Sequence, residues 1–256
     1  MDEPLLVVEG LSKHFAGLRA LEDYQLRLAA NAIVGVIGPN GAGKTTLFNV
    51  LTGFLRPTAG RVRLRGRDIT GMPAYQIARL GIARTFQNIR LFGSLSAVEN
   101  VKVALQSRMR ASLIETLVSA PAFLRRERDL DARARELLTL VGIGARHDDL
   151  ARNLPYGDQR RLEIARAVAT GPQILLLDEP NAGMNPSETA GLLRLIRRLR
   201  DELGLTIVLI AHDIPLVMNL CERIQVLNYG RLIAEGPPAL VRNNPEVIAA
   251  YLGQAA

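Results

Sequence analysis

The chain has 256 residues, enough for one large α/β domain or for a core domain with a smaller insertion. Hydrophobic residues make up 48% of it and aromatic residues only 4%, with no tryptophan, so the sequence predicts a mainly aliphatic core. The net charge of +7 fits an anionic ligand, nucleic acid or an anionic membrane surface, although a solvated basic surface is the simpler explanation. The single cysteine, Cys221, excludes an internal disulfide and a cysteine cluster for zinc.

The first residues, MDEPLLVVEG, carry acidic side chains where a signal peptide needs positive charge. The longest run without a charged residue covers 28–43, which is 16 residues, and Asn, Gly and Pro interrupt it. A membrane-spanning helix needs about 20 mostly apolar residues. The sequence therefore predicts a cytosolic chain that does not itself cross a membrane.

Short apolar runs bounded by turn residues predict strands along much of the chain. In chain order they fall at 5–8, 33–37, 61–65, 81–85, 174–177, 206–210, 223–227 and 232–235. The alternating run 61–65 is typical of an edge strand, whereas the continuous apolar runs at 174–177 and 206–210 are typical of parallel strands buried on both faces. Helices are predicted at 45–52 and at 187–203, where Ser187 and Glu188 suit a first turn.

The middle of the chain has a different pattern. From about 94 to 141 helix-forming residues dominate, with apolar residues such as Val98, Val101 and Leu105 at helical spacing. We therefore expect an α/β core formed by 1–88 and 166–240, interrupted by a helical insertion at about 89–165. A short helical tail is expected at about 241–256.

The segment GPNGAGKT at 38–45 matches the pattern G-x-x-x-x-G-K-[ST], with a predicted strand before it and a helix after it. Glycines let successive backbone N–H groups turn toward phosphate oxygens, and the helix N-terminus adds the positive end of its dipole. Lys44 supplies a charge for the β- and γ-phosphates, and the Thr45 hydroxyl suits Mg²⁺. The predicted nucleotide-binding residues are Gly38, Pro39, Asn40, Gly41, Ala42, Gly43, Lys44, Thr45 and Thr46. A glycine-rich turn that happens to contain lysine is the alternative.

Two carboxylates, Asp178 and Glu179, follow the predicted strand at 174–177. In a doubly wound sheet the carboxyl ends of the strands face the ligand crevice. Asp178 suits Mg²⁺, Glu179 suits a general base that polarises the attacking water, and His212, at the end of 206–210, can donate to the γ-phosphate. The alternatives are ordinary strand-to-loop sequence and a loop histidine, and the phosphate loop in the same chain argues against both.

Together these motifs resemble those of an ABC-type ATPase, the ATP-binding subunit of an importer, over essentially the whole chain. The resemblance implies a P-loop NTPase fold, with a mostly parallel sheet flanked by helices, an antiparallel β part and an inserted helical subdomain. It implies that ATP and Mg²⁺ are bound, and that Gln87, in TFQN, joins the core to the insertion and touches Mg²⁺ and the attacking water. The implied metal residues are Thr45, Gln87 and Asp178, and the implied catalytic residues are Glu179, His212 and Gln87.

The segment NLPYGDQRR at 153–161 is similar to the signature loop of this family, which contacts the ATP bound by a second subunit. The residues implied in that contact are Leu154, Pro155, Tyr156, Gly157 and Asp158. Pro155 stands where the family usually has serine, so it lacks the hydroxyl that donates to the γ-phosphate. Asn185 stands where the family usually has aspartate in a segment between the subunits, and Phe15 falls where the family stacks an aromatic ring on adenine. A core phenylalanine is the alternative for Phe15.

Finer features resemble the LivG-type ATPases of branched-chain amino acid importers: SAPAFLRR at 119–126, YGDQRRLEIARA at 156–167 and NNPEVIAAYLG at 243–253. This implies import of branched-chain amino acids, with amides, urea and other small amino acids or carboxylates as alternatives. The implied partners are a second ATPase subunit (a LivF-type paralogue or an identical copy), two membrane permease subunits and, indirectly, a periplasmic or extracellular solute-binding protein. The chain is then expected at the cytoplasmic face of a bacterial inner membrane, as a peripheral protein without direct contact to nucleic acid.

Three other functions fit the sequence less well. A P-loop GTPase should carry an Asn-Lys-x-Asp motif that reads the base, and the sequence has none. A soluble ABC ATPase acting on nucleic acid or ribosomes would fit the charge, but such proteins typically carry a long coiled-coil insertion or two ATPase cassettes. A regulatory subunit that does not hydrolyse ATP is not expected to retain Glu179 and His212.

Overall fold

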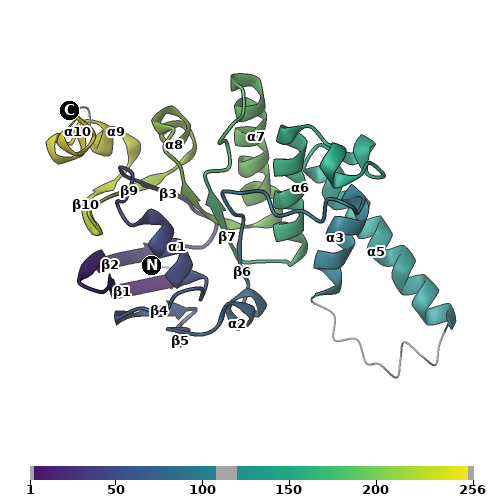
Figure 1. The fold of residues 1–256 in the computed structure, drawn as a ribbon, viewed down its shortest axis with the longest axis horizontal. Helices are drawn as coiled ribbons and strands as arrows, with labels where there is room; N and C mark the ends of the chain where they lie inside the picture. Colours follow the sequence, from purple (N-terminus) through teal and green to yellow (C-terminus); the bar gives the residue numbers. More distant parts are fainter. Residues whose placement is uncertain (1–2, 108–119, 253–256) are drawn as a thin grey trace.

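The computed structural model describes residues 3–107 and 120–252, which form two β-sheets with helices packed around them (Figure 1). The central six-stranded sheet has the order β10-β9-β3-β8-β7-β6. Its neighbouring strands are parallel except β9 and β10, which pair antiparallel. The strands are β3 (Ile33–Ile37), β6 (Ile82–Arg84), β7 (Ile174–Asp178), β8 (Thr206–Ile210), β9 (Arg223–Asn228) and β10 (Arg231–Gly236). The predicted strands in these regions are confirmed to within one residue at each end.

A smaller antiparallel sheet has the order β2-β1-β4-β5. Its strands are β1 (Leu6–Phe15), β2 (Leu18–Leu28), β4 (Ala59–Leu64) and β5 (Arg67–Asp68). The prediction that 61–65 forms an edge strand is wrong, because β4 pairs with β1 on one side and with the short β5 on the other. β2 is absent from the predicted strands because Glu22 and Asp23 interrupt its alternating pattern, and register shifts in the pairing with β1 accommodate them.

Helices cover both faces of the central sheet. Alternate residues of the buried strands point to opposite sides. On β8, Ile207 and Leu209 belong to the core on one face of the sheet, whereas Val208 and Ile210 belong to the core between the other face and the smaller sheet. The helices are α1 (Lys44–Leu51), α2 (Ala74–Arg79), α3 (Ala97–Gln106), α5 (Ala120–Leu140), α6 (Tyr156–Ala169), α7 (Pro186–Leu203), α8 (Ile214–Leu220), α9 (Pro238–Arg242) and α10 (Pro245–Leu252).

The helices α3 and α5 lie at one end of the molecule and α9 and α10 at the other (Figure 1). The first pair falls in the region predicted to be helical, and α10 falls in the predicted tail, whereas α9 begins three residues before the predicted start of the tail at about 241. Residues 108–119 and 253–256, which include the ends of two LivG-like segments at Ser119 and Gly253, lie outside the described residues. Within the described ranges, none of the helices is long and apolar enough to span a membrane.

A buried hydrogen bond links the two sheets. The hydroxyl of Tyr24 on β2 donates to Oε1 of Gln225 on β9, and Gln225 Nε2 donates to the carbonyl of Gln25 at 3.0 Å. Tyr24 and Gln225 are both 0% exposed, so their polar atoms have to be satisfied within the protein. Burial raises the pKa of Tyr24, so the phenol keeps the proton that it donates.

Helix α7 begins with a capping box. Asn185, rather than Ser187, is its N-cap: Asn185 Oδ1 accepts from the backbone N–H of Glu188 at 2.9 Å, and Glu188 Oε2 accepts from the backbone N–H of Asn185 at 2.9 Å. Pro186 occupies the first turn, where its missing N–H costs no hydrogen bond. Asn185 therefore satisfies the start of the helix that follows β7.

We expect Asn185→Ala to lower the free energy of unfolding by about 1 kcal/mol, because it removes half of this capping box. For a chain of this size that lowers the melting temperature by about 2–4 °C, which differential scanning calorimetry can resolve. Ser187→Ala is the matched control, because Ser187 lies in the same first turn but is not part of the capping box. Equal melting temperatures for the two variants would contradict the role of Asn185.

Candidate functional site

The register of the central sheet aligns the ends of three strands. Val36 of β3 pairs with Ile210 of β8, and Ile210 pairs with Asp178 of β7. The glycine-rich loop begins two residues after Val36, Glu179 directly follows Asp178, and His212 comes two residues after Ile210. Because the strands are parallel, these segments leave the sheet at the same edge.

The glycine-rich loop depends on conformations and close contacts that only glycine tolerates. Gly43, the N-cap of α1, has φ 103°, and a Cβ there would lie 2.4 Å from the carbonyl oxygen of Ala20. Gly38 has φ 152°, and a Cβ there would lie 2.1 Å from the carbonyl oxygen of Leu227. Larger residues are excluded at both positions, and the loop leads directly into the N-terminus of α1.

Lys44 is the first residue of α1 and is 8% exposed. Its Nζ donates to the carbonyl oxygens of Gly38 at 2.6 Å and Pro39 at 2.8 Å. Burial lowers the pKa of Lys44, whereas the nearby carboxylates of Glu179 and Asp178 act in the opposite direction. The loop carbonyls therefore hold the ammonium group, and both carboxylates favour its charged form. Of the other loop residues, Ala42 is buried, Thr46 is partly buried, and Asn40, Gly41 and Thr45 are exposed.

Asp178 forms a buried ion pair with Arg84 of β6. Arg84 Nη2 lies 2.6 Å from Asp178 Oδ2, and the two side chains are 5% and 6% exposed. Arg84 Nη1 also donates to Asn49 Oδ1 at 2.7 Å, which anchors the guanidinium to α1. The carboxylate predicted to serve magnesium is therefore held by a residue of the neighbouring strand.

The three predicted catalytic side chains meet at Glu179. Gln87 Nε2 donates to Glu179 Oε2 at 3.0 Å, and His212 Nδ1 lies 3.6 Å from the same oxygen. The backbone N–H of Glu179 donates to the carbonyl of Ile210 at 2.8 Å. Glu179 has φ 47°, a conformation that is uncommon for residues other than glycine and that recurs at functional sites. The strand end thus projects this carboxylate toward Gln87 and His212.

Pro155 is the N-cap of α6, with φ −53°, so the helix starts at the position expected for a signature loop. The carbonyl of Pro155 accepts from the backbone N–H groups of Asp158 at 3.0 Å and Gln159 at 2.9 Å. The Asp158 carboxylate pairs with Arg146 at 3.1 Å. The helix therefore starts normally although its cap offers no side-chain hydroxyl.

The neighbours of Pro155 pack against other segments of the chain. Leu154 is buried, and Tyr156 is 44% exposed. The Tyr156 ring lies against Gly183, where a Cβ would be 3.2 Å from Cε1. Gly157 is buried against Glu188, because a Cβ at Gly157 would be 2.8 Å from Glu188 Oε1. The start of α6 is thereby fixed to the segment between β7 and α7.

Arg160, which is 2% exposed, connects the start of α6 to the segment around Gln87. Its guanidinium donates to the carbonyl oxygens of Phe86, at 2.7 Å, and Gln87, and to the Tyr156 hydroxyl at 3.2 Å. Glu163, one turn later, accepts from Arg160 at 3.1 Å and from the backbone N–H of Phe86 at 3.2 Å. Burial raises the pKa of Glu163, against the effect of these donors.

Arg84 and Arg160 are site residues that the sequence patterns do not reveal. Both side chains are almost completely buried, and a buried charge requires a partner. The sequence does not show this burial. It does not identify Asp178 or the Gln87 carbonyl as the partners either, because these lie in other segments of the chain.

Phe15 lies at the end of β1 and is 40% exposed, which excludes the alternative that it is a core residue. Lys13 Nζ lies 4.9 Å from the centre of its ring. The adjoining strand β2 contacts the phosphate loop through Ala20 and Gly43. The Phe15 ring is therefore partly exposed on the antiparallel sheet, whose strand β2 adjoins the phosphate loop.

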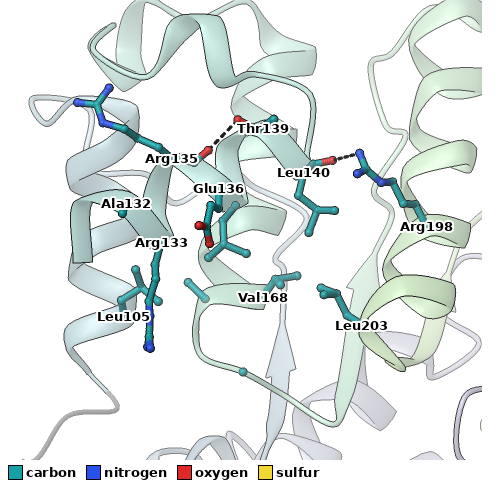
Figure 2. A pocket seen from close by; sticks show the side chains of 13 residues that line it. Leu105, Ala132, Arg133, Arg135, Glu136, Thr139, Leu140, Val168, Arg198 and Leu203 are labelled. Atoms are coloured by element: carbon teal, nitrogen blue, oxygen red, sulfur yellow. Dashed lines mark hydrogen bonds between the residues drawn. The ribbon is translucent and has the colours of Figure 1, made fainter. Parts of the chain in front are cut away.

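Two cavities lie beside α6. One, of about 400 Å³, is lined by residues of β6, α3 and α6 and of the segment that follows Thr85, including Phe86 and Arg90; we call it the α3/α6 groove. The other, of about 740 Å³, lies between α5, α6 and α7 and is lined by apolar residues such as Leu140 and Leu203 together with charged residues such as Glu136 and Arg198 (Figure 2). No predicted site residue is among the described residues that line the second cavity.

Comparison with known proteins places the chain in a family. A model described as ABC transporter matches residues 21–182, and a model described as branched-chain amino acid ATP-binding cassette transporter matches residues 231–256. The high-affinity branched-chain amino acid transport ATP-binding protein LivG of Escherichia coli (strain K12) is 49% identical over 255 residues, which cover 100% of both chains.

Solved structures give the same result. A nucleotide-free ATP-binding cassette from an ABC transporter has a TM-score of 0.83 and 28% identity, covering 97% of this chain and 98% of that chain. A dimeric cassette in a post-hydrolysis state with ADP and phosphate has a TM-score of 0.75 and 27% identity, covering 91% and 98%. These similarities favour a function in transport over the alternative function, in which an ABC ATPase acts on nucleic acid or ribosomes. The matches and the converging strand ends together assign the chain to the ABC transporter family, among the ATP-binding subunits that hydrolyse ATP to drive transport.

Proposed function

We propose that this chain hydrolyses ATP to power import of branched-chain amino acids, or of related small amino acids or amides. The observation that carries the ATPase part is the meeting of Glu179, Gln87 and His212 beside the phosphate loop. The substrate class rests on the full-length similarity to LivG.

Residues 38–46 bind the phosphates of ATP. The backbone N–H groups of the loop and the N-terminus of α1 attract the anion, and Lys44 adds a full charge close by. The exposed ring of Phe15 stacks on the adenine. A nucleoside triphosphate is therefore favoured by three contacts: the N–H groups of the loop and helix N-terminus, the Lys44 ammonium, and the Phe15 ring.

Thr45, Gln87 and Asp178 supply oxygen ligands of the kind that Mg²⁺ prefers. The part of the chain that the structure describes contains no cluster of three or more His, Cys, Asp or Glu residues that could hold a metal. This suits an ion bound mainly by nucleotide phosphates, which needs only one or two protein oxygens. When bound, Mg²⁺ neutralises charge on the phosphate oxygens.

Glu179 accepts a proton from the attacking water. The water oxygen bonds to the γ-phosphorus while the bond from that phosphorus to the bridging oxygen breaks, so ADP and phosphate form. Gln87, hydrogen-bonded to Glu179 Oε2, orients the carboxylate and the water. His212 is 61% exposed at its side chain and donates to the γ-phosphate.

A second ATPase subunit, a LivF-type paralogue or an identical copy, completes each site. The exposed Pro155 and Tyr156 offer the start of α6 to the ATP on that subunit, together with Leu154, Gly157 and Asp158. The similarity to a dimeric cassette with ADP and phosphate supports this arrangement. ATP between the subunits favours the closed dimer, and hydrolysis removes that preference.

The α3/α6 groove receives a short helix of a permease subunit. Phe86 and Val103 give it apolar walls, and Arg90 and Arg166 make it predominantly basic, so an apolar helix with an acidic side chain matches it. The chain is then a peripheral protein on the cytoplasmic face of the inner membrane. It works with two permease subunits and, indirectly, a solute-binding protein.

In this assignment residues 1–88 and 166–240 form the nucleotide-binding core, about 89–165 form the helical subdomain, and about 241–256 form the tail. Helix α6 continues across the junction at 165–166. A movement of the subdomain is therefore transmitted to the core through a continuous helix.

Glu179→Gln should leave ATP binding intact but reduce ATP turnover at least about 100-fold, because the amide cannot accept the proton of the attacking water. In proteoliposomes with the assembled transporter, ATP-dependent uptake of leucine should be lost. The control is Glu246→Gln, at an exposed position on α10. Turnover near that of the control would remove Glu179 from its role.

Pro155→Ser should speed hydrolysis in the site that this segment completes on the partner subunit. A hydrogen bond to a charged group is worth about 1.5–3 kcal/mol, or roughly tenfold to a hundredfold in rate if it is fully formed in the transition state. The measurement is single-turnover hydrolysis by the assembled two-subunit complex. Pro237→Ser, at the N-cap of α9, is the matched control. An unchanged rate would show that the missing hydroxyl does not limit that site.

A further inference from the structure

Arg84 lies between Asp178 and the α3/α6 groove. Its Cζ lies 5.4 Å from the ring centre of Phe48 and 5.1 Å from that of Phe86. Its Nη1 donates to Asn49 Oδ1 at 2.7 Å, and its Nη2 donates to Asp178 Oδ2 at 2.6 Å. Only 5% of the side chain is exposed, so two rings and two hydrogen bonds fix the planar guanidinium in one place.

The bond from Arg84 determines how Asp178 is presented. Oδ2 of Asp178 is used by Arg84, and no hydrogen bond from the described residues reaches Oδ1. A carboxylate with one oxygen held by a charged donor keeps its other oxygen in a defined direction. Without Arg84, Asp178 would lose the charged donor that is hydrogen-bonded to it, although Lys44 stays nearby, and its carboxylate would be free to rotate toward other donors.

Arg84 also lines the α3/α6 groove. Arg84 and Phe86 line this cavity together with Val103 of α3 and Glu163 of α6. Phe86 therefore has two contacts at once, with the interior of the groove and with the guanidinium of Arg84. An occupant that displaces the Phe86 ring displaces one wall of the pocket that holds Arg84.

We propose that Arg84 is a positioning residue for the magnesium site and that it transmits occupancy of the α3/α6 groove to Asp178. The first part is independent of what fills the groove. The second part rests on the proposed function, in which a permease helix is the occupant. This route runs from Phe86 through Arg84 to Asp178, and it is separate from the contact between Gln87 and Glu179.

Arg84→Lys tests the first part in the isolated chain. Lysine keeps the positive charge, but it cannot bridge Asn49 and Asp178 as the guanidinium does. We expect the affinity for Mn²⁺ in the presence of ATP, measured by electron paramagnetic resonance, to fall about 10- to 100-fold. ATP affinity in EDTA should stay unchanged, because the phosphate loop is intact. Arg79→Lys, where the guanidinium lies 5.8 Å from the Tyr75 ring, is the matched control.

Asn49→Ala provides a second variant if Arg84→Lys fails to fold. It removes only the acceptor of Arg84 Nη1, so Mn²⁺ affinity should fall by about three- to tenfold. Wild-type Mn²⁺ affinity in the folded variants would overturn the positioning role. Equal losses of ATP affinity with Mn²⁺ and in EDTA would also overturn it, because they would show a general structural effect. None of these results bears on the proposed function, which the Glu179→Gln experiment tests separately.

The assembled transporter tests the second part. Wild-type Mn²⁺ affinity should differ between the isolated chain and the complex by about fivefold or more, and Asn49→Ala should reduce that difference. Equal affinities in the isolated and assembled wild-type protein would overturn the connection between groove and metal. A chain that binds no permease at all would instead count against the proposed function.

Discussion

The parallel pairing of β3, β8 and β7 is the constraint on which the site depends. Val36, Ile210 and Asp178 stand in one row, so the phosphate loop, the two carboxylates and His212 all begin at the same edge of the sheet. A shift of one residue in either pairing would turn alternate side chains to the opposite face. The complete burial of β3, β7 and β8 makes such a shift costly. The core therefore determines the geometry of the chemistry.

Besides contributing to the positive net charge, several arginines hold other segments of the protein in place from buried or partly buried positions. Arg84 holds Asp178, Arg160 holds the Phe86 and Gln87 carbonyls, and Arg166 donates to the carbonyl of Arg90. Burial of a charge is unfavourable unless nearby polar groups compensate it. For Arg160 and Arg166 those groups include carbonyls of the segment between β6 and α3, whereas Arg84 is compensated by Asp178 and Asn49. The segment that carries Gln87 is thus positioned by charged side chains from α6.

The start of α6 shows how a helix end can keep its shape while its chemistry changes. Pro155 caps α6 with backbone geometry alone, and Tyr156 packs on Gly183 and accepts from Arg160. The direction of the helix dipole and the backbone N–H groups of the first turn are retained. The start of α6 therefore keeps its backbone groups without a side-chain hydroxyl, whereas the glycine-rich loop holds Lys44, and Glu179 and His212 approach each other at the carboxyl edge of the central sheet.

Local patterns in the amino-acid sequence are enough to predict the phosphate loop, the strand that ends in Asp178 and Glu179, and the position of His212, because each depends on apolar runs, glycines and turn residues. The strands of the central sheet were also predictable, most clearly β3, β7 and β8, whose complete burial gives mainly apolar runs. The strand β2, the interior place of β4, the exposure of Phe15 and the partners of Arg84 and Arg160 were decided by the tertiary structure. Each of these depends on which segment lies beside which, and side chains such as Arg84 and Asp178, 94 positions apart, meet only when the sheet has formed.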